Sequence, residues 1–236
     1  MATSGITENQ LTRNQFIEAA LRKLNVIALG QTPEAEDYTN GTIAFNALIS
    51  EFRSLGMPLW ARTSYTFALT LNTFSYSIGT SQTFNTPYPL KVLQAYRVDS
   101  GNTTRIPIEI QPDYNYNLYP ASSGGRPIQL SYQPKVNTGT IKVWPIPDAD
   151  AVANSTITIV YQRPTEYMSS STDTLDMPEE WYNAIIYNLA SRLAPEWGIP
   201  LPDRQILDST AEKILNRALE NGSEDGSFYW QPVRQM

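Results

Sequence analysis

The side chains best suited to chemistry in this sequence are carboxylates that gather before a predicted helix. Asp173 and Asp176 precede Glu179 and Glu180, and paired carboxylates can act as acid and base in glycoside hydrolysis. Acidic residues also collect at the first turn of a helix, because the helix dipole favours negative charge there. We therefore interpret these residues as a helix start and predict no catalytic residue among them.

The residue types on which most enzymes depend are absent. The 236 residues include no histidine and no cysteine, which removes the commonest general base, the commonest metal ligand and any thiol nucleophile. The stretch Ser122–Gly125 lacks the Gly-Lys-Ser/Thr ending of a phosphate-binding loop. We predict that the chain is not an enzyme, binds no metal and needs no cofactor.

The charge is acidic and unevenly distributed. The formal net charge is −6, and residues 175–236 carry ten acidic and five basic side chains. Arg22-Lys23 is the only adjacent basic pair, so the basic stripe of a sequence-specific DNA-binding protein is missing. The first ten residues do not resemble a signal peptide, and no apolar run approaches the roughly 20 residues that cross a bilayer. We expect synthesis in a cytoplasm and no membrane contact.

Two helices are predicted near the N-terminus. Apolar residues recur at helical spacing over 12–26 and again over 34–55. Thr12 and Gln15 have the spacing of a capping box. Gly41 interrupts the apolar stripe of the second stretch. Together the two stretches predict a helical hairpin.

Helical spacing returns near the C-terminus. Asp176 and Glu179 resemble a second capping box, and an apolar stripe then runs to about residue 193. A last helix is predicted to begin at Pro202-Asp203, with an apolar stripe made of Ile206, Thr210, Ala211, Ile214, Leu215 and Ala218.

The apolar period between the two helical regions is two, which is typical of β-strands. Short runs of this kind are divided by glycine, asparagine and proline, and they lie at 63–71, 74–78, 90–98, 104–110, 127–133, 139–144 and 156–162. Nine prolines between residues 87 and 147 indicate that several strands are short or lie at an edge. These features predict a sandwich or a small barrel.

The change of period gives the expected fold class and domains. The class is α+β: a discontinuous four-helix domain, 1–62 and 175–221, with an inserted antiparallel β-sandwich or barrel domain, 63–174. Each helical hairpin has an apolar face too wide to leave in water, and the two faces can cover each other.

Residues 222–236 are predicted to form a flexible docking tail. The segment has no periodicity, and its apolar residues follow a Gly-Ser-Glu-Asp-Gly-Ser lead. These residues can fold back on the core of the chain or bind a partner, because exposed aromatic side chains are unfavourable in water. The docking residues that we predict are Phe228, Tyr229, Trp230, Pro232 and Val233.

Four stretches resemble, in this order, the podovirus-type head-to-tail adaptors, also described as tail accessory or packaged-DNA stabilisation proteins. The resemblance spans roughly residues 15–220, and the four stretches in this order are a more specific signal than any one of them. The stretches are Phe16–Val26 with Gln31–Pro33, Phe84–Leu90, Gly139–Asp148, and Leu175–Ala190 with Leu193–Gly198.

The resemblance implies a structural protein in the neck of a virion. Copies are expected to form a ring, usually of twelve, below the portal protein, to extend its DNA channel and to contact tail, nozzle or further neck proteins. The tail residues would dock on the portal. Glu179, Glu180, Glu212 and Glu220 are candidates for a channel wall that repels the passing double-stranded DNA, which would be bound without sequence preference.

Two other functions are compatible with parts of the sequence. A β-sandwich rich in Tyr and Trp could be a tail-associated carbohydrate-binding module, and the carboxylates could belong to a cell-wall hydrolase. The flanking helical hairpins favour the adaptor, because a sugar-binding module rarely needs them.

Overall fold

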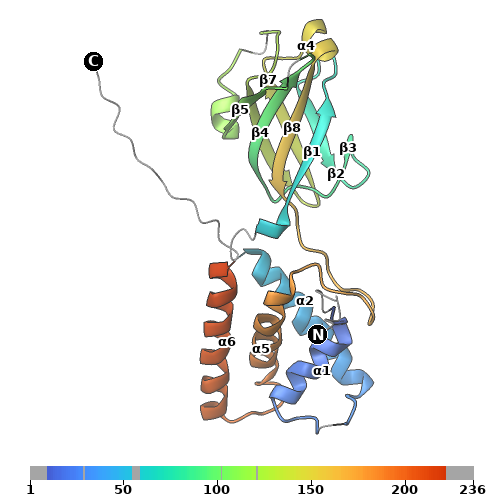
Figure 1. Cartoon of the computed structure of the whole chain (residues 1–236), viewed down its shortest axis with the longest axis vertical. Coiled ribbons are helices and arrows are strands. Elements are labelled where there is room, and N and C mark those ends of the chain that lie inside the picture. Colours follow the sequence, from blue (N-terminus) through green and yellow to red (C-terminus); the bar gives the residue numbers. More distant parts are fainter. Residues whose placement is uncertain (1–9, 29, 55–58, 102, 121, 222–236) are drawn as a thin grey trace, which may run out of the picture. The chain divides into compact units, whose positions relative to one another are not determined.

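The computed structural model describes residues 10–28, 30–54, 59–101, 103–120 and 122–221. The chain divides into two compact units (Figure 1). One, the helical unit, combines Met1–Trp60 with Thr165–Met236, and the other, the β unit, is the single stretch Ala61–Pro164. Helices and strands are both present in quantity, so the predicted α+β class is confirmed.

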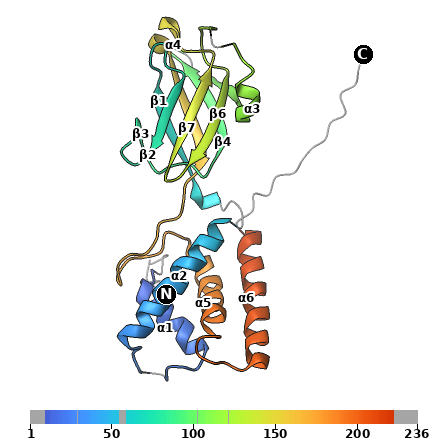
Figure 2. The same cartoon turned by 180° about the vertical axis from the view of Figure 1, so that it is seen from behind.

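The helical unit contains α1 (Arg13–Lys23), α2 (Ala35–Ser54), the 3₁₀ turn η2 (Glu179–Trp181), α5 (Tyr182–Leu193) and α6 (Leu201–Asn221). Helix α5 packs against α1, α2 and α6, and α1 also packs against α2. Figures 1 and 2 show α5 between α6 and the α1–α2 pair. Helices from both ends of the sequence therefore share one core.

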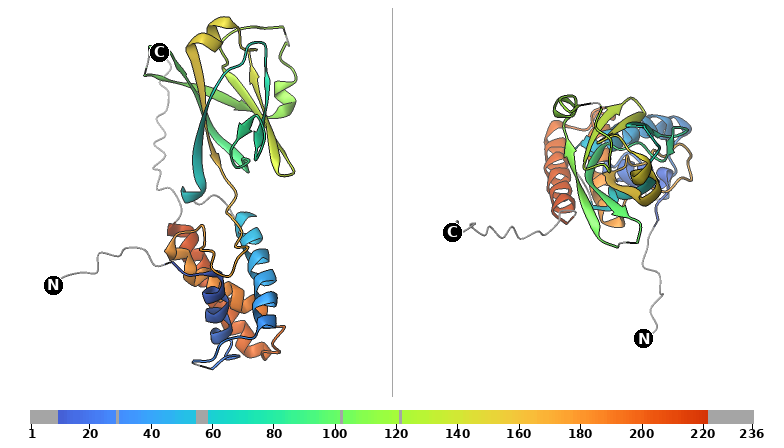
Figure 3. Two further views of the ribbon diagram at one scale, coloured as in Figure 1. Left: turned by 90° about the vertical axis from the view of Figure 1, so that its right-hand side faces the viewer. Right: turned by 90° about the horizontal axis from the view of Figure 1, so that it is seen from above.

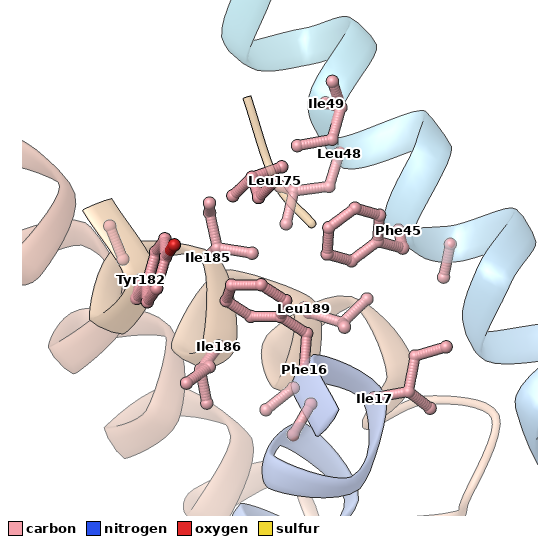
Figure 4. Packing of buried hydrophobic residues seen from close by; sticks show 14 of the residues in the cluster. Phe16, Ile17, Phe45, Leu48, Ile49, Leu175, Tyr182, Ile185, Ile186 and Leu189 are labelled. Carbon is pink, nitrogen blue, oxygen red and sulfur yellow. The ribbon is translucent and has the colours of Figure 1, made fainter. Parts of the chain in front are cut away.

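That core is built from large apolar side chains of three helices. Phe16 of α1 is fully buried, and its ring meets the ring of Phe45 of α2 at 5.7 Å between centroids and the ring of Tyr182 of α5 at 5.0 Å. Figure 4 shows Phe16 among residues of α2 and α5. Helix α6 contributes less, because only Ala211 and Ala218 of its residues are buried.

The glycine inside α2 allows α1 and α2 to approach closely. A Cβ atom at Gly41 would lie 2.6 Å from Cγ2 of Ile17, which is fully buried in α1. The helix-weakening glycine is therefore explained by packing.

One of the two predicted capping boxes is confirmed and the other is wrong. The Thr12 N–H donates to Gln15 Oε1 at 2.8 Å, and the Gln15 N–H donates to Thr12 Oγ1 at 3.4 Å. At the second site the N-cap of η2 is Pro178, with no side-chain hydrogen bond. Asp176, two residues before that N-cap, accepts the N–H of Glu166 at 3.3 Å.

The segment that follows the β unit lies with the helices. The boundary falls between Pro164 and Thr165, ten residues before the position 174 expected from the sequence. Met168 is buried in the helical core, and the Arg13 N–H donates to the Asp173 carbonyl at 3.1 Å. This segment ties the start of α1 to the chain that precedes η2.

The β unit is one eight-stranded sheet in the order β1-β8-β4-β5-β6-β7-β2-β3. Two short helices, α3 (Asp113–Tyr116) and α4 (Ala149–Asn154), and the 3₁₀ turn η1 (Leu59–Ala61) accompany it. The strands are β1 (Arg62–Ala68), β2 (Ser75–Gly79), β3 (Phe84–Asn85), β4 (Lys91–Asp99), β5 (Arg105–Gln111), β6 (Gln129–Lys135), β7 (Thr138–Trp144) and β8 (Ser155–Gln162).

The sequence predicted an antiparallel sheet, but two of the strand pairs are parallel. These are β5–β6 and β2–β3. A long connection that includes α3 separates β5 from β6 and lets the chain return to the starting end of the sheet, which a hairpin turn cannot do. The remaining pairs are antiparallel.

The sheet curls into a nearly closed barrel (Figure 3). Its terminal strands meet through aromatic side chains: Phe67 of β1 lies 4.3 Å from Phe84 of β3, and Tyr76 of β2 lies 5.0 Å from Phe84, between ring centroids. The interior is filled by fully buried aliphatic residues such as Leu130, Ile141, Ile157 and Ile159.

Candidate functional site

The carboxylates that precede α5 have structural partners. Asp173 accepts the N–H groups of Ser170 at 2.6 Å and Ser169 at 2.8 Å. The bond from Ser170, with those from Ser169, lowers the pKa of Asp173 below its ordinary value. With Asp176 bonded to Glu166, both aspartates shape a loop.

The part of the chain that the structure describes contains no group of three acidic side chains placed to hold a metal ion. Within the same residues, no helix is long and apolar enough to span a bilayer.

Three of the four acidic channel candidates come together at one end of the α5–α6 pair. Glu179 and Glu180 lie in η2, which contacts α6, and Glu220 lies in the last turn of α6. All three are exposed. Glu212 is also exposed but lies eight residues earlier in α6, which is about 12 Å along the helix axis. The arrangement is a local concentration of negative charge.

The predicted docking tail lies outside the described residues. Its apolar positions are Phe228, Tyr229, Trp230, Pro232 and Val233. They remain a prediction from the sequence.

The structure exposes a feature that the sequence pattern did not indicate, namely a groove of about 550 Å³ between α1, α5 and α6. Ile206, which we expected on the buried stripe of the last helix, lines this groove and is 67% exposed. Helical periodicity identifies an apolar face but not whether another part of the same chain covers it. The nearby Leu201 is 60% exposed.

The polar cluster of the β unit is an ion-pair network at one end of the barrel. Asp99 accepts Arg97 Nε at 2.8 Å, Arg126 Nη1 at 2.7 Å and the Ser155 hydroxyl at 2.7 Å. Arg126 also contacts Asp150 at 2.7 Å. Burial raises the pKa of Asp99, but these hydrogen bonds and the two arginine charges outweigh burial and lower it. The network joins β4, β8 and α4 and serves the fold.

Three aromatic residues of the β unit, Tyr116, Tyr119 and Trp144, are engaged in the fold. Trp144 stacks on Tyr119 with 4.7 Å between centroids, and its indole N–H donates to the Pro120 carbonyl at 3.1 Å. Tyr116 is buried and donates its hydroxyl to the Val143 carbonyl at 2.9 Å.

The comparison with models of protein families supports the structural role inferred from the sequence. No curated protein matches the chain. A solved chain from the neck of an empty GTA particle with C6 symmetry is similar, at 15% identity and a TM-score of 0.26; the match covers 78% of this chain and 82% of that one. The model of the SU10 adaptor protein family matches residues 12–233. This chain therefore belongs to the SU10 adaptor family and is a structural adaptor rather than an enzyme.

Proposed function

We propose that this protein is the head-to-tail adaptor of a tailed bacteriophage, and that copies form a ring, a dodecamer, below the portal. The observation that carries the proposal is the family match, which runs through both units from residue 12 to residue 233. The ring extends the DNA channel of the portal and connects it to tail, nozzle or further neck proteins. The protein is made in the host cytoplasm and located in the virion.

The two units have separate roles in this proposal. The helical unit, built from both ends of the sequence, forms a four-helix domain that surrounds the channel and contacts the portal. The β unit faces outward or towards the tail. A self-contained barrel suits an outward position, because its interior is filled by its own side chains.

The acidic end of the α5–α6 pair contributes to the channel wall. Glu179, Glu180 and Glu220 are exposed together there, and Glu212 extends the acidic surface along α6. Negative charge repels the phosphate backbone, so DNA passes without sticking and is bound without sequence preference.

Residues 222–236 dock on the portal. The family match extends to residue 233 and so includes Phe228, Tyr229, Trp230, Pro232 and Val233. Each buried aromatic side chain contributes roughly 2–3 kcal/mol, and a ring of tails raises the effective concentration of every tail at its site.

Negative-stain microscopy of the purified protein mixed with its portal tests the proposal. We expect rings of protein capping the portal, and far fewer after deletion of residues 222–236, with the circular dichroism unchanged. A protein that leaves portals bare under all conditions would contradict the adaptor role. Truncated protein that decorates portals at wild-type occupancy would contradict the docking tail alone.

A DNA-binding measurement tests the channel wall. We expect no tight binding of double-stranded DNA at physiological salt, and weak, salt-dependent binding by the Glu179→Lys/Glu180→Lys/Glu220→Lys variant, because added cations release counterions from DNA. Sequence-selective, sub-micromolar binding by the wild-type protein would contradict a passive channel.

A further inference from the structure

The groove of the helical unit is left open by the residues that the structure describes, and half of its ten lining residues are apolar. It is lined by the end of α1, by Tyr187 of α5 and by the first turns of α6, including the exposed Ile206 and the partly buried Leu207. Lys23 and Asp203 are the charged residues on its lining. A volume of about 550 Å³ gives room for a protruding side chain and its neighbours.

A protruding apolar side chain is present on another helix of the same unit. Ile43 of α2 is 67% exposed, as fully as Ile206 in the groove. Its face of the helix continues through Asn40, Ala47 and Ser50, which are exposed and follow the 3- and 4-residue spacing of a helix–helix contact. Residues 39–50 include no charged side chain, so burying this face takes no charge out of water.

The two surfaces lie on different sides of the helical unit. Residues of α1, α5 and α6 line the groove, and none of α2 does. Helix α2 packs on α1 and α5 with its buried face, which leaves Ile43 pointing outward. Figure 1 shows the unit from the α1 side and Figure 2 from the α2 side. Ile43 therefore cannot fill the groove of its own chain.

The charges around the two surfaces are complementary. Glu36 lies on the same face of α2 as Ile43, two turns earlier, and Lys23 stands at the groove. On α6, the face that carries Ile206 continues through Lys213 and Arg217, both exposed. The α2 face thus carries an acid at its start, and Lys23 provides a cation at the groove that can meet it.

We propose that the α1–α5–α6 groove of one copy receives the Ile43 face of α2 from a second copy of this chain. The proposal rests on the ring assembly proposed above and identifies its contact. Because the two surfaces differ, the contact is head-to-tail and leaves each copy with one surface of each kind. Such a contact repeats until a ring closes.

Cysteine cross-linking tests the contact, because the natural chain has no cysteine. Ile43→Cys and Ile206→Cys proteins are mixed with the portal and oxidised. We expect disulfide-linked dimers from the mixture and none from either protein alone. A chain carrying both substitutions should give a ladder of covalent multimers. The matched control is a chain that carries Ile43→Cys and Glu212→Cys. Glu212 lies on α6, as Ile206 does, but on a different face of that helix, so this control should give no ladder.

The outcomes separate this proposal from the proposed function. Rings on the portal without the Ile43–Ile206 cross-link would overturn the contact and leave the adaptor role standing. Dimers from Ile43→Cys alone would show a symmetric contact and would also overturn it. The groove could instead be covered by the portal or by residues 222–236. In that case the complexes would protect Ile206→Cys from a thiol reagent but would show no cross-link to Ile43→Cys. Absence of any ring would overturn both proposals.

A charge exchange provides a second readout that does not depend on cysteine. Glu36→Lys should weaken self-association several-fold, as expected for an exposed ion pair repeated around a ring. Adding Lys23→Glu to the same chain should restore it, because the pair is then reversed. If both variants are folded by circular dichroism but the double variant does not regain self-association, the proposed pairing of Glu36 with Lys23 is contradicted. Ile206→Asp should reduce association by at least about 100-fold, because it buries an unpaired charge.

Discussion

The helical unit and the β unit bury their apolar side chains in different ways. The β unit is one continuous stretch whose sheet curls until Phe67 meets Phe84, and its strands fill their own interior. The helical unit needs both ends of the sequence to complete its core, and it leaves Ile43 and Ile206 in water. Exposed apolar side chains do not distinguish the units, since Val136 of the β unit is 90% exposed. The difference lies in the cores: the barrel closes its core within one stretch of sequence, whereas the helical core depends on both ends.

The largest expected effect comes from cutting the chain at the unit boundaries. A fragment of residues 61–164 should fold by itself, because every strand and both edges of the sheet are inside it. A fragment of residues 1–60 should be unfolded, because Phe16 loses Tyr182 and the rest of α5. Circular dichroism and amide-proton dispersion in NMR spectra measure both results. A folded 1–60 fragment would show that the N-terminal helices do not need the C-terminal helices in order to fold.

The second prediction compares a buried and an exposed residue within the helical unit. Phe16→Ala should lower the free energy of unfolding by about 3–5 kcal/mol, through lost burial and the cavity left behind. Ile43→Ala, on the exposed face of α2, should change it by less than about 0.5 kcal/mol. Urea denaturation gives both values. An equally large loss for Ile43→Ala would mean that α2 is buried within the monomer and would remove the proposed contact.

Local features of the fold could be predicted from the sequence. The alternation around Leu130 and Ile141 placed their strands within two residues, because side chains of a strand alternate between two faces. The capping box at Thr12 was also predicted, since both of its partners lie within four residues. The second N-cap was predicted at Asp176 but lies at Pro178, and the contact of Asp176 with Glu166 comes from a loop that no local pattern describes.

Long-range features could not be predicted in the same way. The parallel pairing of β5 with β6 depends on how a long connection returns to the sheet. The groove is formed by side chains from three helices, of which Lys23 and Ile206 are far apart in the sequence. Ile206 is exposed because α6 packs mainly on α5, which leaves that side of α6 open. The apolar spacing of a helix is the same whether its face is covered or open.

The third prediction concerns electrostatics, in which the two units also differ. In the β unit Asp99 is largely buried and bonded to Arg97, Arg126 and Ser155. In the helical unit the pair Arg22–Glu18 lies at the surface. Asp99→Asn should therefore cost the β unit about 1–3 kcal/mol at pH 7, since it removes charged hydrogen bonds. Removing the surface pair with Arg22→Gln, which leaves the Tyr38–Glu18 hydrogen bond in place, should cost less than about 1 kcal/mol.

The pH dependence of that loss gives a further check. The pKa of Asp99 is lowered in the folded state, so its contribution is fully present above the ordinary aspartate value of about 4. The contribution is lost as the pH falls through the lowered folded value. The difference between wild type and Asp99→Asn should shrink as the pH falls from 4 towards that value. Amide exchange of β8 measures it, and a difference that grows on acidification would contradict the network.

The smallest expected effect tests the close approach of α1 and α2 at Gly41, whose counterpart in the barrel is Gly139, where a Cβ atom would meet the ring of Tyr132. Gly41→Ala gains about 1 kcal/mol in helix propensity, but the new Cβ lies 2.6 Å from Ile17 Cγ2, and overpacking costs about 1–3 kcal/mol. The net result should be a loss of about 1 kcal/mol. Ile17→Ala removes the obstructing atoms, so in that background Gly41→Ala should become stabilising by up to about 1 kcal/mol. Urea denaturation of the four proteins of this double-mutant cycle measures the coupling. The same destabilisation in both backgrounds would mean that Gly41 is required by the backbone of α2 rather than by its contact with α1.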